Sequence, residues 1–154
     1  MDSAALVEEI GHRLARAGQR WTPGRRVVVE IFESARSPLS MQELQDRAAQ
    51  RRVPLSSLYR IVSDLVAASV LVRLEFEEGF ARFELTEELA HHHHHLVCTD
   101  CGRVEDFEGP GMPSLERAVD DAMRSIKRRH KFSVQNHRLD FFGTCGACST
   151  GAGR

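Results

Sequence analysis

The sequence predicts an α+β protein in which a winged helix-turn-helix is followed by a second, mixed αβ domain. Apolar residues in the first half recur at helical spacing, and the period then changes to the alternation of strands. The second half holds all four cysteines, arranged as two CxxC pairs, and a run of five histidines. A length of 154 residues suits two small domains.

Start signals and apolar faces predict the helices of the first half. Thr22 before Pro23 places a capping hydroxyl ahead of proline at the first helical position. Ser40 and Glu43 have the spacing of a capping box. The expected helices cover about residues 4–16, 23–34, 41–50 and 56–67.

Two segments after these helices predict a β-hairpin. Residues 70–76 and 80–85 alternate in polarity, and Glu77-Glu78-Gly79 would form the turn between them. In a winged helix the last helix before the hairpin lies in the major groove of DNA, which assigns that role to residues 56–67. The alternative is any small helical domain that ends in a hairpin.

Positive charge is concentrated in the predicted helices, although the formal net charge of the chain is −1. Residues 11–60 hold ten arginines and four acids, a local excess of +6. Such an excess fits a DNA-binding face, because neutralisation of phosphates supplies most non-specific affinity. A solvated helical surface is the alternative.

The second half begins after an expected linker at residues 86–90. A strand is predicted over 91–98 and another over 103–107. A loop at 109–113 would lead to a helix over about 114–129 and to a last strand over 132–142. A glycine-rich tail follows.

The cysteines form the pairs Cys98/Cys101 and Cys145/Cys148. Two residues between thiolates let both sulfurs bind one ion, and two such pairs are the ligand set of a tetrahedral structural zinc. A dithiol redox pair and surface thiols are the alternatives, but a redox pair would leave the matching second pair unexplained.

The histidine run, His91–His95, leads directly into the first cysteine pair. An expression tag or a low-complexity metal-binding tract would also produce such a run. In a strand, however, side chains alternate, so His92 and His94 face one side and His93 and His95 the other. One strand can therefore serve two metal sites. The other candidate ligands are His137 and the acids Glu84, Asp106, Glu116 and Asp120.

Several function classes are disfavoured by what the sequence lacks. No apolar run reaches the roughly 18 residues of a membrane span, and the acidic N-terminus lacks a signal-peptide core, so we expect a cytoplasmic protein. The chain has no HExxH motif and no His-x-Glu paired with PCxxC, which argues against a zinc enzyme. A metal-storage or chaperone protein would explain the histidines but not the arginine-rich helices.

Four strings carry a family resemblance: FELTEELAHHHHHLVCTDCGRVEDF, GTCGAC, TPGRR and SSLYRIVSDLVAASVL. Together they make the chain resemble the ferric uptake regulator family from about Arg16 to Cys148. The resemblance implies a winged-helix DNA-binding domain over 1–85, a hinge over 86–91 and a metal-binding dimerisation domain over 92–154. It further implies a homodimer that represses metal-uptake genes from a palindromic operator when metal is bound, or a peroxide-responsive regulator.

The resemblance also implies the role of each site residue. The structural zinc would be held by Cys98, Cys101, Cys145 and Cys148. The regulatory ion would be held by Glu84, His93, His95 and Asp106, and a second ion by His92, His94, Asp120 and His137, with Glu116 as the alternative to Asp120. DNA would be contacted by Arg16, Ser57, Tyr59 and Arg60. Because two histidines and two carboxylates accept Fe²⁺, Zn²⁺ and Mn²⁺ alike, all three remain candidates for the regulatory metal.

Overall fold

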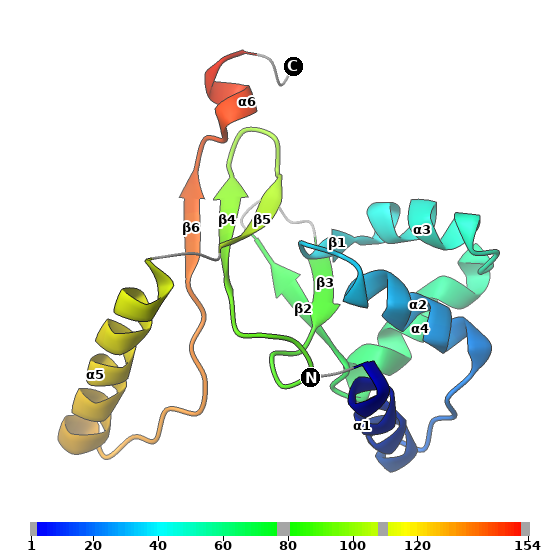
Figure 1. Ribbon diagram of the computed structural model, residues 1–154, viewed down its shortest axis with the longest axis horizontal. Helices are drawn as coiled ribbons and strands as arrows, with labels where there is room; N and C mark the ends of the chain where they lie inside the picture. The colour runs from blue at the N-terminus through cyan, green and yellow to red at the C-terminus, as the bar shows by residue number, and fades with distance from the viewer. Residues whose placement is uncertain (1–2, 77–80, 108–110, 152–154) are drawn as a thin grey trace. The chain divides into compact units, whose positions relative to one another are not determined.

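The computed structural model describes residues 3–76, 81–107 and 111–151 and divides the chain into two compact units, residues 1–92 and 93–154 (Figure 1). The mixture of helices and sheets confirms the expected α+β class. The expected turn at Glu77–Gly79 and the start of the loop expected at 109–113 lie outside the described residues.

Four helices build most of the first unit: α1 (Ser3–Arg16), α2 (Pro23–Glu33), α3 (Met41–Gln50) and α4 (Leu55–Ala67). Both expected caps are confirmed. The Thr22 hydroxyl accepts a hydrogen bond from the backbone N–H of Arg25 at 3.4 Å. Ser40 and Glu43 form a reciprocal capping box, which satisfies N–H groups that the first turn of α3 would otherwise leave without acceptors.

The expected hairpin is present as β2 (Leu71–Glu75) paired antiparallel with β3 (Ala81–Leu85). A third strand that we did not expect, β1 (Leu39–Ser40), pairs antiparallel with the other edge of β3, so the order is β1-β3-β2. Two residues are too few for an alternation pattern, and for this reason the sequence does not reveal β1.

The hydrophobic core of the first unit lies between the helices and this sheet. Its fully buried side chains include Ile10 and Leu14 of α1, Leu44 of α3 and Leu65 of α4. At one crossing, α2 and α4 approach closely: a Cβ at Gly24 would lie 3.2 Å from the Ile61 side chain. We conclude that α4 is held firmly against the rest of its unit.

The segment expected to be a hinge, 86–91, largely belongs to the first unit. The backbone N–H groups of Leu89 and Ala90 donate to the Thr86 carbonyl, and Leu89 is 4% exposed within the core. The division between the units falls after His92. An apolar Leu89 among polar residues is the sequence signal for this anchoring.

The second unit contains β4 (His94–Cys98), β5 (Val104–Phe107), α5 (Met112–His130), β6 (Asp140–Gly143) and the short α6 (Gly146–Ser149). Its sheet has the order β5-β4-β6, with β5 antiparallel and β6 parallel to β4. The strands expected over 91–98 and 132–142 are shorter than expected. Because β4 begins at His94 and pairs with β6 from the register His95↔Asp140, residues before Asp140 have no neighbouring strand to extend the pairing.

The second unit buries few apolar side chains. Among its described residues these are Val97, Cys98 and Val104, and α5 buries none. Large apolar side chains remain exposed on the unit, namely Leu96, Phe132, Phe141 and Phe142. A surface with this many exposed aromatic and aliphatic side chains is typical of an interface that a partner covers.

Candidate metal centres and DNA-binding surface

The four cysteines converge at one end of the sheet in the second unit. Their sulfur atoms lie within 4.8 Å of one another, and the Sγ atoms of Cys101 and Cys145 are 3.9 Å apart. Four sulfurs at about 2.3 Å from a tetrahedral zinc would be separated by roughly 3.8 Å. The cysteines therefore have the arrangement that a structural zinc requires, which confirms the expected four-cysteine cluster.

The surroundings of the cysteines shift the pKa values of their thiols in opposite directions. The N–H of Cys145 donates to the sulfur of Cys98 at 3.3 Å, and this contact, followed by the N–H of Cys101, lowers the pKa of the Cys98 thiol to about 6. The neighbouring thiols of Cys145 and then Cys101 raise the pKa of Cys148 well above its ordinary value. Four thiolates in this space thus need a cation to balance them.

A second cluster forms on one side of β4. His94, which is 1% exposed, places Nε2 2.8 Å from Oε1 of Glu116, and His137 Nε2 lies 3.5 Å from Oε2 of the same carboxylate. The ring centroids of the two histidines are 5.5 Å apart. Two imidazoles that share one carboxylate form a donor set that suits Zn²⁺, Fe²⁺ or Mn²⁺.

The acid in this cluster is Glu116, the expected alternative, and not Asp120. Asp120 is exposed on α5. Glu116 and Asp120 are four residues apart and lie on one face of α5, so the sequence pattern does not show which of the two turns reaches His94. His92, the fourth ligand expected here, is exposed, and its Nδ1 lies 3.1 Å from Oε1 of Glu87 within the first unit.

His93, His95 and Asp106 gather in a third group. The rings of His93 and His95 meet edge to face with centroids 5.0 Å apart, and His93 Nε2 lies 3.9 Å from Oδ1 of Asp106. Asp106 is also the antiparallel partner of His95 in β5. His94, between the two histidines in sequence, has its contacts with Glu116 instead. The histidines therefore alternate as a strand predicts.

The fourth residue expected in this group, Glu84, lies in β3 of the first unit, opposite Val72 of β2. Its side chain is half-buried. The structure thus places Glu84 before the division between the units and the other three expected ligands after it.

The outer face of α4 presents the residues expected to contact DNA. Tyr59 is 59% exposed, Arg60 is exposed and Ser57 is half-buried. Leu55, one turn before Tyr59, is 46% exposed and was not among the expected contacts. Arg16, the last residue of α1, has a side chain 75% exposed.

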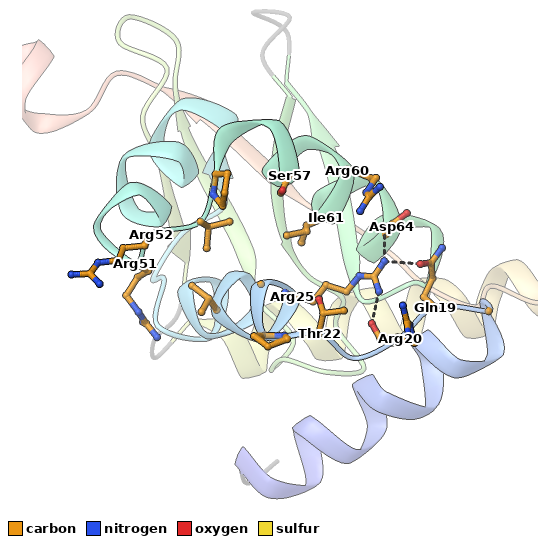
Figure 2. Close-up of a pocket in the computed structure, with 16 residues that line it drawn as sticks. Gln19, Arg20, Thr22, Arg25, Arg51, Arg52, Ser57, Arg60, Ile61 and Asp64 are labelled. Atoms are coloured by element: carbon orange, nitrogen blue, oxygen red, sulfur yellow. Dashed lines mark hydrogen bonds and ion pairs between the residues drawn. The ribbon is translucent and has the colours of Figure 1, made fainter.

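A cleft of about 740 Å³ lies beside α4 and extends to the first turn of α2 (Figure 2). Ser57 and Arg60 both line it. The lining includes one acid, Asp64, and five arginines: Arg20, Arg25, Arg51, Arg52 and Arg60. This charge balance makes the cleft attractive to a phosphate backbone.

Arg25 ties α4 to its surroundings in this cleft (Figure 2). The guanidinium is buried, donates to Asp64 of α4 at 2.5 Å and to Gln19 at 2.6 Å, and also donates to the carbonyl of Arg20. Sequence reasoning missed this role. The spacing of Arg25 relative to Val28, Val29 and Phe32 places it on the buried face of α2, which was a usable signal.

Comparison with known proteins identifies the family. The model of the ferric uptake regulator family matches residues 16–142. The ferric uptake regulation protein of Bacillus subtilis is 30% identical over 147 residues, which cover 93% of this chain and 94% of that protein. The chain belongs to the ferric uptake regulator family.

Solved structures of the ferric uptake regulator family agree with this assignment. The crystal structure of the Vibrio cholerae ferric uptake regulator is 28% identical, with a TM-score of 0.68, and the match covers 88% of this chain and 98% of that one. The Pseudomonas aeruginosa regulator with manganese is 25% identical, with a TM-score of 0.66, over 86% of this chain and 95% of that one.

Membership in the ferric uptake regulator family makes this chain a metal-responsive regulator. Regulators of this family bind DNA and are dimeric. No helix within the described residues has the length and apolar character needed to cross a membrane.

Proposed function

We propose that the chain is a metal-dependent transcriptional repressor that binds a palindromic operator as a homodimer and controls genes of metal homeostasis. The observation that supports this most directly is the alternation of His93, His94 and His95, which supplies ligands to two separate acid-containing groups. His93 is the first residue of the second unit and directly follows the unit that carries the arginine-lined cleft.

The proposed DNA interface is the outer face of α4 together with the arginine-lined cleft beside it. Leu55 and Tyr59 would meet base edges, and Ser57 and Arg60 would contact bases and backbone from the same helix. Arg16, at the end of α1, would reach the neighbouring groove. Two such faces in a twofold dimer require a palindromic site.

The proposed regulatory site consists of Glu84, His93, His95 and Asp106. Glu84 belongs to the first unit and the other three to the second, so residues that share one ion would restrict the angle between the units. Such an ion shifts the population towards the DNA-binding angle only because it binds that state more tightly. His92, His94, Glu116 and His137 would hold a second ion, and the donor sets accept Fe²⁺, Zn²⁺ or Mn²⁺.

The function can be tested by selecting duplexes from a random library with the zinc-loaded dimer in the presence and absence of Mn²⁺ or Fe²⁺. We expect a palindromic sequence to be enriched only with the metal, and binding to it to weaken steeply between low and physiological salt. Equal enrichment with and without metal would exclude metal-dependent repression.

Arg60→Ala should weaken operator binding by about 1–3 kcal/mol without changing metal content, because it removes a cation from the reading helix. Fluorescence anisotropy with a labelled operator measures this loss, and the salt dependence should become less steep. Arg128→Ala removes the same charge from an exposed position of α5 and serves as the control. Equal affinities of the two variants would contradict the proposed interface.

Glu116→Gln should lower the affinity of the second metal site, whereas Asp120→Asn should leave it unchanged. The reason is the position of Glu116 between His94 and His137, in contrast to the exposed Asp120. Isothermal titration with Mn²⁺ compares the matched variants. A loss of affinity in Asp120→Asn alone would return the ligand role to Asp120.

A further inference from the structure

His95 lies in the central strand of the second unit between two carboxylates. Its antiparallel partner is Asp106 of β5, and its parallel partner is Asp140 of β6. Residues directly opposite each other in neighbouring strands project to the same face of a sheet. The three side chains therefore lie in one row across β5, β4 and β6.

The two carboxylates have different surroundings. Oδ1 of Asp140 lies 3.2 Å from Nδ1 of His95, and Oδ2 lies 2.5 Å from a guanidinium nitrogen of Arg138. The side chain of Asp140 is only 13% exposed. Both oxygens of Asp140 thus have a partner within the second unit. Asp106, in contrast, lies near His93, with its Oδ1 3.9 Å from His93 Nε2.

We propose that Asp140 is a positioning residue that fixes His95 as a metal ligand. A neutral imidazole carries its proton on one nitrogen and a lone pair on the other. The carboxylate of Asp140 accepts a hydrogen bond from Nδ1, so the lone pair is on Nε2, and Nε2 would be the atom that binds an ion together with His93 and Asp106. Histidine ligands commonly donate their second N–H to a carboxylate in this way, which also fixes the orientation of the ring.

Arg138 completes the arrangement by balancing the charge of Asp140. It bonds the oxygen that does not face His95, so the carboxylate is held from both sides. Each oxygen of Asp140 therefore has a partner, and the two partners together hold the carboxylate beside His95. The inference rests on the proposed regulatory site and adds to it a residue that orients a ligand without touching the ion.

The first test reads the proton position in the metal-free site. In the zinc-loaded dimer without Mn²⁺, long-range ¹H–¹⁵N correlation spectra should show His95 protonated on Nδ1. His95→Gln identifies its signal. Asp140→Ala should lose this fixed tautomer, while Asp140→Asn should keep it because the amide oxygen still accepts from Nδ1. A wild-type His95 protonated on Nε2 alone would overturn the proposal.

The second test measures Mn²⁺ affinity in the Glu116→Gln background, which disables the other histidine cluster. Mn²⁺ prefers oxygen and imidazole to thiolates, so it leaves the cysteine zinc in place. Asp140→Ala should weaken binding about 10–100-fold, the usual effect of losing such a partner. Asp140→Asn should recover most of the loss. Asp121→Ala, at an acid 77% exposed on α5, should have no effect.

The outcomes separate the possible roles of Asp140. Unchanged Mn²⁺ affinity in Asp140→Ala overturns the inference, and so does an equal loss in both Asp140 variants with the tautomer retained, because that pattern identifies Asp140 as a ligand. If Asp140→Ala fails to fold, the single variants Asp140→Asn and Arg138→Gln are compared in its place. The two measurements are again the tautomer of His95 and the affinity for Mn²⁺. If Mn²⁺ binding depends on Asp140 but DNA binding does not change with Mn²⁺, the proposed function is refuted and this inference still holds.

Discussion

Cys145→Ser is expected to abolish the folded second unit and, with it, the dimer. Cys145 contributes both a sulfur to the four-cysteine cluster and the backbone N–H that bonds Cys98. Structural zinc sites of this kind supply about 10–16 kcal/mol in small domains, more than a protein unit can lose and remain folded. Native mass spectrometry should show no retained zinc, and sedimentation should show monomers.

The single tryptophan, Trp21, lies in the first unit and provides the internal control. Its fluorescence should still report a cooperative transition in Cys145→Ser, because the core of the first unit does not include the cysteines. Ser149→Ala alters the same short helix without touching the cluster and should keep both zinc and dimer. A Cys145→Ser dimer with one tightly held zinc would contradict the structural role of the cluster.

The same cluster predicts how zinc affinity depends on pH. Zinc binds thiolates, and the raised pKa of Cys148 means that binding must release its proton. The apparent zinc affinity of the folded site should therefore fall as the pH is lowered. Competition with a chromophoric chelator at several pH values measures this slope, and an affinity independent of pH would argue against thiolate ligation.

His95→Ala is expected to abolish metal-dependent DNA binding while the dimer and the structural zinc remain. The proposed regulatory site combines Glu84 of the first unit with His93, His95 and Asp106 of the second, so an ion bound there would couple metal to the angle between the units. Fluorescence anisotropy with a labelled operator duplex measures this. At every Mn²⁺ concentration, His95→Ala should bind the duplex with the affinity that it has without metal.

His95 is 3% exposed, so its loss also leaves a cavity, and His95→Gln provides a variant of similar size. His91→Ala removes an exposed histidine of the same run and should respond to metal like the wild type. If both His95 variants still bind DNA in proportion to metal, the switch belongs to the cluster of His94, Glu116 and His137.

Local signals allowed the sequence to predict much of the fold, and longer-range pairing accounts for what it missed. The caps at Thr22 and Ser40 depend on neighbours within three residues, and the alternation of the histidines depends only on extended backbone. The choice between Glu116 and Asp120, by contrast, depends on which turn of α5 contacts the sheet. The role of Asp140 depends on the register between β4 and β6, which no local pattern contains.

The interior of the second unit contains histidine and cysteine side chains, whereas the interior of the first unit consists mainly of apolar side chains. His94, His95 and Cys98 are among the most buried residues of the second unit. The free energy of unfolding of this unit should therefore depend on ligand concentration, since ligands that bind only the folded state raise the stability with the logarithm of their concentration. The lifetime of the protein in the presence of a protease should then lengthen as the concentrations of free zinc and of the chain rise, so starvation for metal would lower the amount of this regulator.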